Sequence, residues 1–123
     1  MATLTPTLTL SSSDMNGDTL NLSVTDSLSI LGQVTTKQVV SSTTGVVFAA
    51  AANYTKSYVY LKNLSTTANE IITIEKANGD DEYLTLGAGE FAFFPWASEV
   101  DLAVDAATGS PVLEVRIFQA TAA

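Results

Sequence analysis

The chain of 123 residues contains no histidine and no cysteine. These two residue types supply most of the nucleophiles, general bases and soft metal ligands that enzymes use. The lack of cysteine also excludes the disulfide framework that marks many small secreted domains. Composition therefore argues against an enzyme, and we expect no catalytic residue, no cofactor and no metal.

Positive charge is scarce, because five lysines and arginines stand against thirteen acidic residues, for a net charge of −8. The cations are scattered along the sequence, whereas nucleic-acid binding needs a basic patch. Apolar residues make up 46% of the chain, but no uninterrupted run is long enough to span a bilayer, and the first residues lack the charged and apolar regions that are typical of a signal peptide. We expect a soluble protein made in the cytoplasm, with no nucleic-acid or membrane partner.

The N-terminal segment has a strong period-two pattern, with serine, threonine and asparagine between apolar residues. This alternation is typical of β-strands that have one apolar face. Asn16 and Gly17 interrupt it, and this pair suits a tight hairpin turn. We therefore predict two antiparallel strands with one buried face, whose apolar residues are Leu4, Leu8, Leu10, Leu20, Leu22, Val24, Leu28 and Ile30.

The middle of the chain continues as strands. Gly32 and Gln33 break the alternation, and we predict two short strands near residues 39–40 and 46–48, followed by a loop with one helical turn near residues 49–53. Residues 58–64 and 71–75 alternate again, with Val59, Leu61, Ile72 and Ile74 pointing inward. From their lengths and spacing we expect these two strands to be adjacent.

Residues 82–96 read as two short strands joined by a Gly-Ala-Gly turn, which predicts an inner hairpin ending in an aromatic cluster. Residues 100–104 and 112–119 complete the strands, and turn signals recur at the spacing that sandwiches require. We predict an all-β fold, a single antiparallel jelly-roll-like β-sandwich over residues 1–123. Residues 1–12 are an edge strand or an extended arm, since Pro6 lacks an N–H and belongs at a sheet edge.

Aromatic residues are the strongest candidates for a binding surface. On a strand Phe91 and Phe93 point one way and Phe94 the other, so they cannot all enter one core. Core packing, a subunit interface and sugar stacking remain open for this group. The candidate interface residues are Leu4, Leu8, Leu10, Tyr58, Tyr60, Phe91, Phe93, Phe94 and Trp96.

Acidic segments give two weaker candidate sites. Residues 14–18 and 78–82 contain Asp, Asn and Glu, but neither has the spacing of a known calcium loop, and we interpret them as turns.

Glu99 with Asp101, or Glu75 with Glu90, could form a glycosidase pair, but Glu99 and Asp101 alternate with apolar residues on a predicted strand, which indicates a solvated face. Asn21, Asn53 and Asn63 match the acceptor pattern of N-glycosylation, and we interpret them as chance matches.

The segments 58–64 and 71–74, the turn at residues 86–91 and the strand at residues 112–118 together resemble small jelly-roll virion proteins of tailed bacteriophages, usually capsid decoration or cement proteins. The Leu86 to Glu90 turn is also similar to that of cupins, but the metal-binding histidines of that family are absent.

The resemblance implies a non-enzymatic structural protein on the capsid surface of the virion. Such a protein binds the major capsid protein or other virion subunits and stabilises the shell, and it is often a symmetric homo-oligomer, for which a trimer is expected here. The N-terminal strand could add to the open sheet edge of a neighbour. The alternative is a carbohydrate-binding or adhesin-like module of a phage head fibre or tail, with exposed aromatics such as Trp96 or Tyr60 stacking on sugar.

Overall fold

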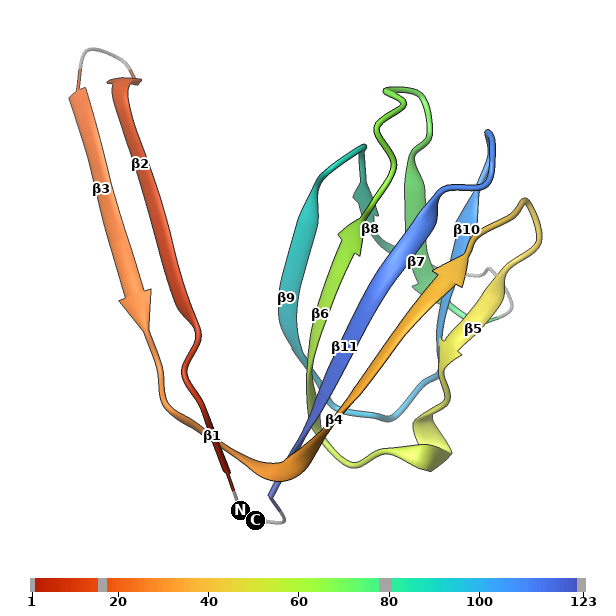
Figure 1. Cartoon of the computed structure of the whole chain (residues 1–123), viewed down its shortest axis with the longest axis horizontal. Helices are drawn as coiled ribbons and strands as arrows, with labels where there is room; N and C mark the ends of the chain where they lie inside the picture. Colours follow the sequence, from red (N-terminus) through yellow and green to blue (C-terminus); the bar gives the residue numbers. More distant parts are fainter. Residues whose placement is uncertain (1, 16–17, 78–80, 122–123) are drawn as a thin grey trace.

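The computed structural model describes residues 2–15, 18–77 and 81–121. These residues form a β-sandwich and a separate two-stranded hairpin (Figure 1). A short 3₁₀ helix at Ala51–Asn53 matches the expected helical turn. The strands in the described part of the chain are β1 (Ala2–Leu4), β2 (Thr7–Met15), β3 (Asp18–Thr25), β4 (Leu28–Val40), β5 (Val46–Ala49), β6 (Ser57–Asn63), β7 (Ile72–Lys76), β8 (Glu82–Leu86), β9 (Phe91–Trp96), β10 (Leu102–Ala106) and β11 (Val112–Ala120).

The sandwich has the connectivity of a jelly roll. One sheet has the order β1-β4-β11-β6-β9 and the other β5-β10-β7-β8. The antiparallel pairs are nested in sequence, because β4 pairs with β11, β5 with β10, β6 with β9 and β7 with β8. A long hairpin rolled up so that consecutive pairs alternate between sheets gives this order. The predicted all-β, antiparallel, jelly-roll-like sandwich is confirmed, but it does not include β2 and β3, which form the separate hairpin.

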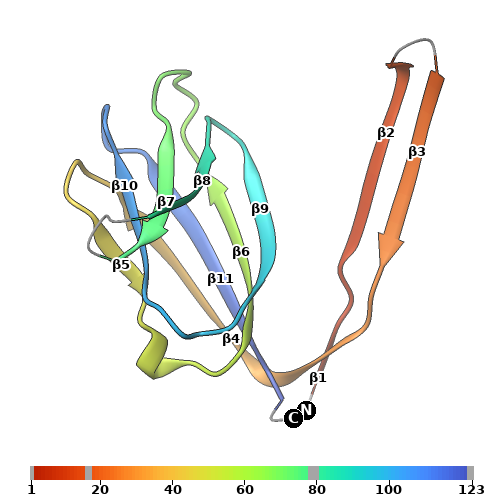
Figure 2. The ribbon, with the colours of Figure 1, turned by 180° about the vertical axis from the view of Figure 1, so that it is seen from behind.

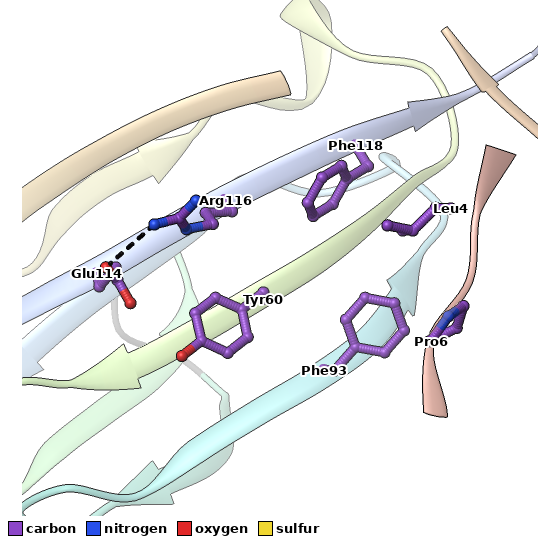
Figure 3. A pocket seen from close by; sticks show the side chains of 7 residues that line it. All are labelled: Leu4, Pro6, Tyr60, Phe93, Glu114, Arg116 and Phe118. Atoms are coloured by element: carbon purple, nitrogen blue, oxygen red, sulfur yellow. Dashed lines mark ion pairs between the residues drawn. The ribbon is translucent and has the colours of Figure 1, made fainter. Parts of the chain in front are cut away.

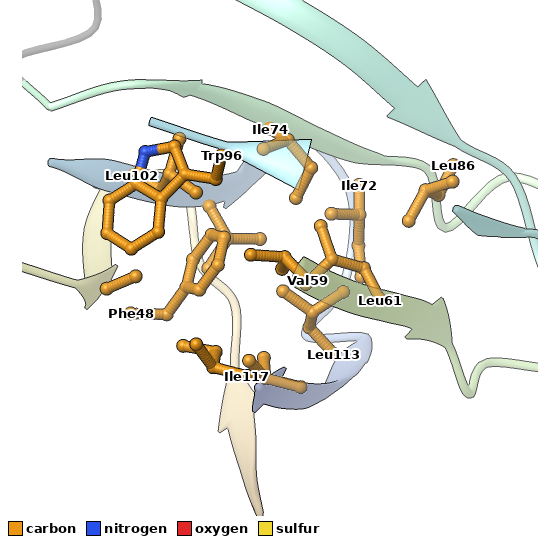
Figure 4. Close-up of a cluster of buried hydrophobic side chains, with 13 residues drawn as sticks. Phe48, Val59, Leu61, Ile72, Ile74, Leu86, Trp96, Leu102, Leu113 and Ile117 are labelled. Carbon is orange, nitrogen blue, oxygen red and sulfur yellow. The ribbon is translucent and has the colours of Figure 1, made fainter. Parts of the chain in front are cut away.

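The core lies between the two sheets, where alternate residues of each strand point inward (Figure 4). In β6 the alternation is complete, and Val59 and Leu61 are fully buried as predicted. Ile72 and Ile74 of β7 meet them from the opposite sheet, again as predicted. The other buried members of this cluster are Phe48, Ala49, Leu86, Trp96, Leu102, Val104, Leu113, Val115 and Ile117.

Two predictions of which strands lie side by side are wrong for the same reason. β6 and β7 were expected to be adjacent, and β8 and β9 to form a hairpin, but the members of each pair lie in different sheets. The turn after Leu86 therefore crosses from one sheet to the other, with Gly89 at φ 77° and Glu90 N–H donating to the Gly87 carbonyl. Rolling of the nested pairs places β6 and β7 in different sheets, and likewise β8 and β9.

Strand β4 corrects a third prediction, since it runs without interruption from Leu28 to Val40 through Gly32. Its first residues pair with β1 and its later residues with β11, whose register shifts between Phe118 and Ala120. Glycine in a strand commonly marks such an irregularity. The glycine thus lies within a curved strand (Figure 1) and does not end it.

The predicted N-terminal hairpin is present as β2 and β3, with Leu10 opposite Leu22. It leads away from the sandwich as an arm (Figures 1 and 2). The prediction that its apolar face is buried is wrong, because Leu8, Leu10, Leu22 and Val24 are 41–53% exposed. Period two identifies an apolar face but does not say that the same chain covers it. The Asn16-Gly17 turn lies outside the described residues.

Candidate functional site

The outer face of the five-stranded sheet carries a group of aromatic side chains from three strands. Cross-strand register places Tyr60 beside Phe93 of β9, and Tyr58 beside Phe118 of β11. Phe91 is 63% exposed and Phe93 40%. The Tyr58 and Phe93 rings lie nearly parallel, with centroids 6.4 Å apart. We call the set Tyr58, Tyr60, Phe91, Phe93 and Phe118 the aromatic face.

The aromatic cluster of β9 divides between surface and core. Phe91 and Phe93 belong to the aromatic face, whereas Phe94 packs against the core and Trp96 is only 6% exposed. The Trp96 ring contacts that of Tyr54 at a centroid distance of 5.8 Å. Of the candidate interface residues, Trp96 and Phe94 are therefore placed inside the sandwich, so Trp96 cannot stack on a sugar.

A cleft of about 370 Å³ lies where the arm joins the sandwich (Figure 3). Leu4 and Pro6, at the base of the arm, line it together with Tyr60, Phe93 and Phe118. An ion pair of 3.6 Å between Arg116 and Glu114 lies at its edge. Burial and the neighbouring Glu114 carboxylate raise the pKa of Tyr60 above 10.0, so its hydroxyl stays neutral.

The arm has two chemically different faces. Leu8 lies opposite Val24 and Leu10 opposite Leu22, while Ser12 lies opposite Leu20. We call the apolar side chains on this face, Leu8, Leu10, Leu20, Leu22 and Val24, the leucine stripe. On the other face Thr7 pairs with Thr25, Thr9 with Ser23 and Ser11 with Asn21. The arm thus presents one apolar surface and one hydroxyl-rich surface.

Cations that look scattered in the sequence gather beside the aromatic face. Lys62 lies opposite Phe91, and Arg116 lies opposite Tyr60. The Lys56 ammonium is 5.5 Å from the Tyr58 ring centroid, a cation–π distance. Three of the five cations of the chain are therefore near one surface, a feature that cross-strand register reveals and linear spacing does not.

The acidic candidates take structural positions. Glu99 and Asp101 lie in the loop before β10, and not on a strand as predicted; the Asp101 carboxylate accepts a 2.7 Å hydrogen bond from the Ala51 N–H. Glu90 accepts from the Gly87 N–H at 2.6 Å. Of the calcium candidates, residues 16–17 and 78–80 lie outside the described part of the chain. Within that part, no group of three or more acidic side chains could hold a metal ion.

A carboxylate pair that the sequence did not suggest is formed by Glu75 and Asp105. Glu75 is on the outer side of β7, yet it is only 4% exposed. The loop at residues 43–45 runs beside it, and a Cβ on Gly45 would lie 3.0 Å from the Glu75 Oε1. Burial first, and then the nearby Asp105 and Glu82, raise the pKa of Glu75 above its ordinary 4.5. Alternation alone places Glu75 in solvent, since it cannot foresee the covering loop.

Replacing Glu75 by glutamine is expected to make the protein more stable at mildly alkaline pH. A carboxyl whose pKa is raised by folding binds its proton more tightly in the folded state. Its contribution to stability is fully present below about pH 4.5 and is lost as the pH rises through the pKa that Glu75 has in the folded state. The neutral Glu75→Gln side chain removes this loss.

Thermal unfolding of both proteins across an acidic-to-alkaline series measures the difference. Glu99→Gln, a change at an exposed residue in the loop before β10, is the control and should shift the pH profile much less. Parallel pH profiles for the wild type and Glu75→Gln would contradict the raised pKa.

Comparisons with known proteins add no relative. No protein-family model matches the chain, and neither curated proteins nor solved structures give a significant match. Among the described residues there is no helix with the length and apolar character to cross a membrane.

Proposed function

We propose that this chain is a structural virion protein that binds the outer surface of a phage capsid as a decoration or cement protein and stabilises the shell. The observation that carries the proposal is the arm with its exposed leucine stripe. An isolated two-stranded hairpin is marginally stable in water, and contiguous exposed apolar surface marks an interaction site. A protein of an assembly has neighbours that can cover this surface.

The jelly-roll fold and the resemblance to phage virion proteins support a capsid as that assembly. The aromatic face gives the same molecule a second exposed apolar surface. A subunit that decorates a shell lies beside shell subunits and beside other copies of itself, and either kind of neighbour can cover an exposed apolar surface.

Quantitative mass spectrometry of purified virus particles tests this role. The number of copies of this chain is measured against the most abundant shell protein in the same particles. We expect a copy number comparable with that of the shell subunits. A few copies per particle would point to a tail or fibre component, and absence from particles would contradict the proposal.

Carbohydrate binding is the second candidate, in a module of a phage head fibre or tail. The nearly parallel rings of the half-buried Tyr58 and the exposed Phe93 favour it, because sugar rings stack on aromatic side chains. In that case Tyr58→Ala with Phe93→Ala should abolish binding on a glycan array, while Tyr83→Ala, on an exposed aromatic of the other sheet, should not. This candidate is excluded if the double variant fails to assemble while the wild type gives no signal on the glycan array.

A further inference from the structure

We infer that the arm of one copy of this chain packs its leucine stripe on the aromatic face of a second copy. The two surfaces are chemically matched, since each is an exposed apolar area on a β-sheet. On the arm, Leu8, Leu10, Leu22 and Val24 are each more than 40% exposed. On the sandwich, Phe91 and Phe93 are exposed to a similar or greater extent. This inference concerns the chain alone and does not rest on the proposed capsid role.

Charge supports a second copy as the occupant. The segment from Ala2 to Thr36 contains three aspartates and no lysine or arginine. Around the aromatic face, Lys56 and Lys62 have no ion pair within the described residues, and Arg116 pairs with Glu114. In a chain of net charge −8, the arm without cations and the surface that carries three of the five cations are thus complementary. Such complementarity orients partners and suppresses wrong pairings.

Geometry supports exchange between copies. Pro6 and Leu4 lie against the aromatic face at the cleft, and the Asp26 N–H donates to the Pro6 carbonyl at 3.1 Å where the two arm strands leave the sandwich. Beyond this point the arm diverges from its own sandwich (Figures 1 and 2). In the described residues, β2 and β3 pair only with each other. A partner's arm can therefore approach the aromatic face from the open side.

Arm exchange forms a closed oligomer when the rotation between neighbouring copies closes. Every copy then gives an arm and receives one, and both surfaces are buried in every subunit. The number of copies follows from the angle between arm and sandwich. The long cross-strand ladder of the arm holds its side chains in one register, so the stripe can dock as a unit.

The first test compares two variants of the full chain with equal charge. Leu10→Lys with Leu22→Glu places an opposite-charge pair on the leucine stripe, and Thr9→Lys with Ser23→Glu places the same pair on the opposite face of the arm. Each pair joins directly opposed residues, so the hairpin keeps a favourable cross-strand contact. Light scattering and sedimentation measure the mass and the dissociation constant of each protein.

We expect the wild type to be a closed oligomer. The variant with Leu10→Lys and Leu22→Glu should dissociate at concentrations at least about tenfold higher than those at which the wild type dissociates. The opposite-face variant should associate as the wild type does. Phe93→Asp should weaken association, and Tyr83→Asp, on the other sheet, should not. A monomeric wild type, or equal effects of the two arm variants, would overturn the inference.

The second test asks which surfaces meet, and it uses the absence of natural cysteine. Chains with Leu10→Cys are mixed with isotope-labelled chains with Phe93→Cys and treated with a short bis-maleimide. Cross-links between labelled and unlabelled chains are expected, and replacing Leu10→Cys by Thr9→Cys should greatly reduce them. Cross-links mainly between two Leu10→Cys chains would indicate arm-to-arm packing. A Leu10→Cys, Phe93→Cys double variant that links only within one chain would show that the arm closes on its own sandwich. Either result would refute arm exchange.

Discussion

Replacing Asn63 by leucine is expected to lower the free energy of unfolding by about 3–5 kcal/mol, because it leaves several backbone groups unpaired. The Asn63 side chain is fully buried at the end of β6. Its amide donates to the carbonyls of Glu70 and Leu86 at 2.9 and 3.0 Å, and its Oδ1 accepts from the Ser65 N–H at 2.9 Å. The bond to Leu86 joins the two sheets, since β6 and β8 belong to different ones. Leucine has a similar size but makes none of these three bonds.

Denaturant unfolding followed by circular dichroism measures this loss. Asn53→Leu is the matched control, because Asn53 is exposed in the 3₁₀ helix and its replacement should change stability by less than about 0.5 kcal/mol. Equal stability of Asn63→Leu and the wild type would contradict the bridging role of this side chain. The burial of Asn63 agrees with the interpretation of its glycosylation-like sequence as a chance match.

Trp96→Ala is expected to lower the free energy of unfolding by about 3–5 kcal/mol, the range for removing a large aromatic side chain from a core. The Trp96 ring fills the space between Tyr54 and the central core cluster. Its indole N–H is buried and finds no acceptor among the described residues. A buried donor without a partner costs stability, so Trp96→Phe should lose much less than Trp96→Ala.

The comparison needs a probe other than tryptophan fluorescence, because Trp96 is the only tryptophan of the chain. Circular dichroism reports unfolding equally in the wild type and both variants. Tyr83→Ala, at an exposed aromatic residue of the other sheet, is the control and should have little effect on stability. A Trp96→Phe loss as large as that of Trp96→Ala would show that the N–H has a partner that stabilises it.

The sequence predicted the strands well, because alternation is a local property of the chain. It identified β6 and β7 with their inward residues, and it placed Phe91 and Phe93 on the side opposite Phe94. It could not predict which strands share a sheet, since β8 and β9 look like a hairpin until the nested pairs roll up. The choice between a rolled and a flat arrangement depends on long-range pairing that no short segment encodes.

The candidate surfaces were predicted only in part. Tyr58 and Tyr60 were expected on an outward face, and the register places them beside Phe93 and Phe118. The exposure of the leucine stripe was missed, because an apolar face looks the same in sequence whether its own core or another molecule covers it. The burial of Glu75 was missed because the covering loop is distant in the chain.

Amide hydrogen exchange at two protein concentrations tests most directly the claim that both apolar surfaces are covered when copies meet. At low concentration the arm, a lone hairpin, should exchange fast. At high concentration we predict slower exchange in β2 and β3 and in β9 beside the aromatic face, with no change in β8 at the edge of the other sheet. Fast exchange of the arm at every concentration, or protection that does not depend on concentration, would contradict the account.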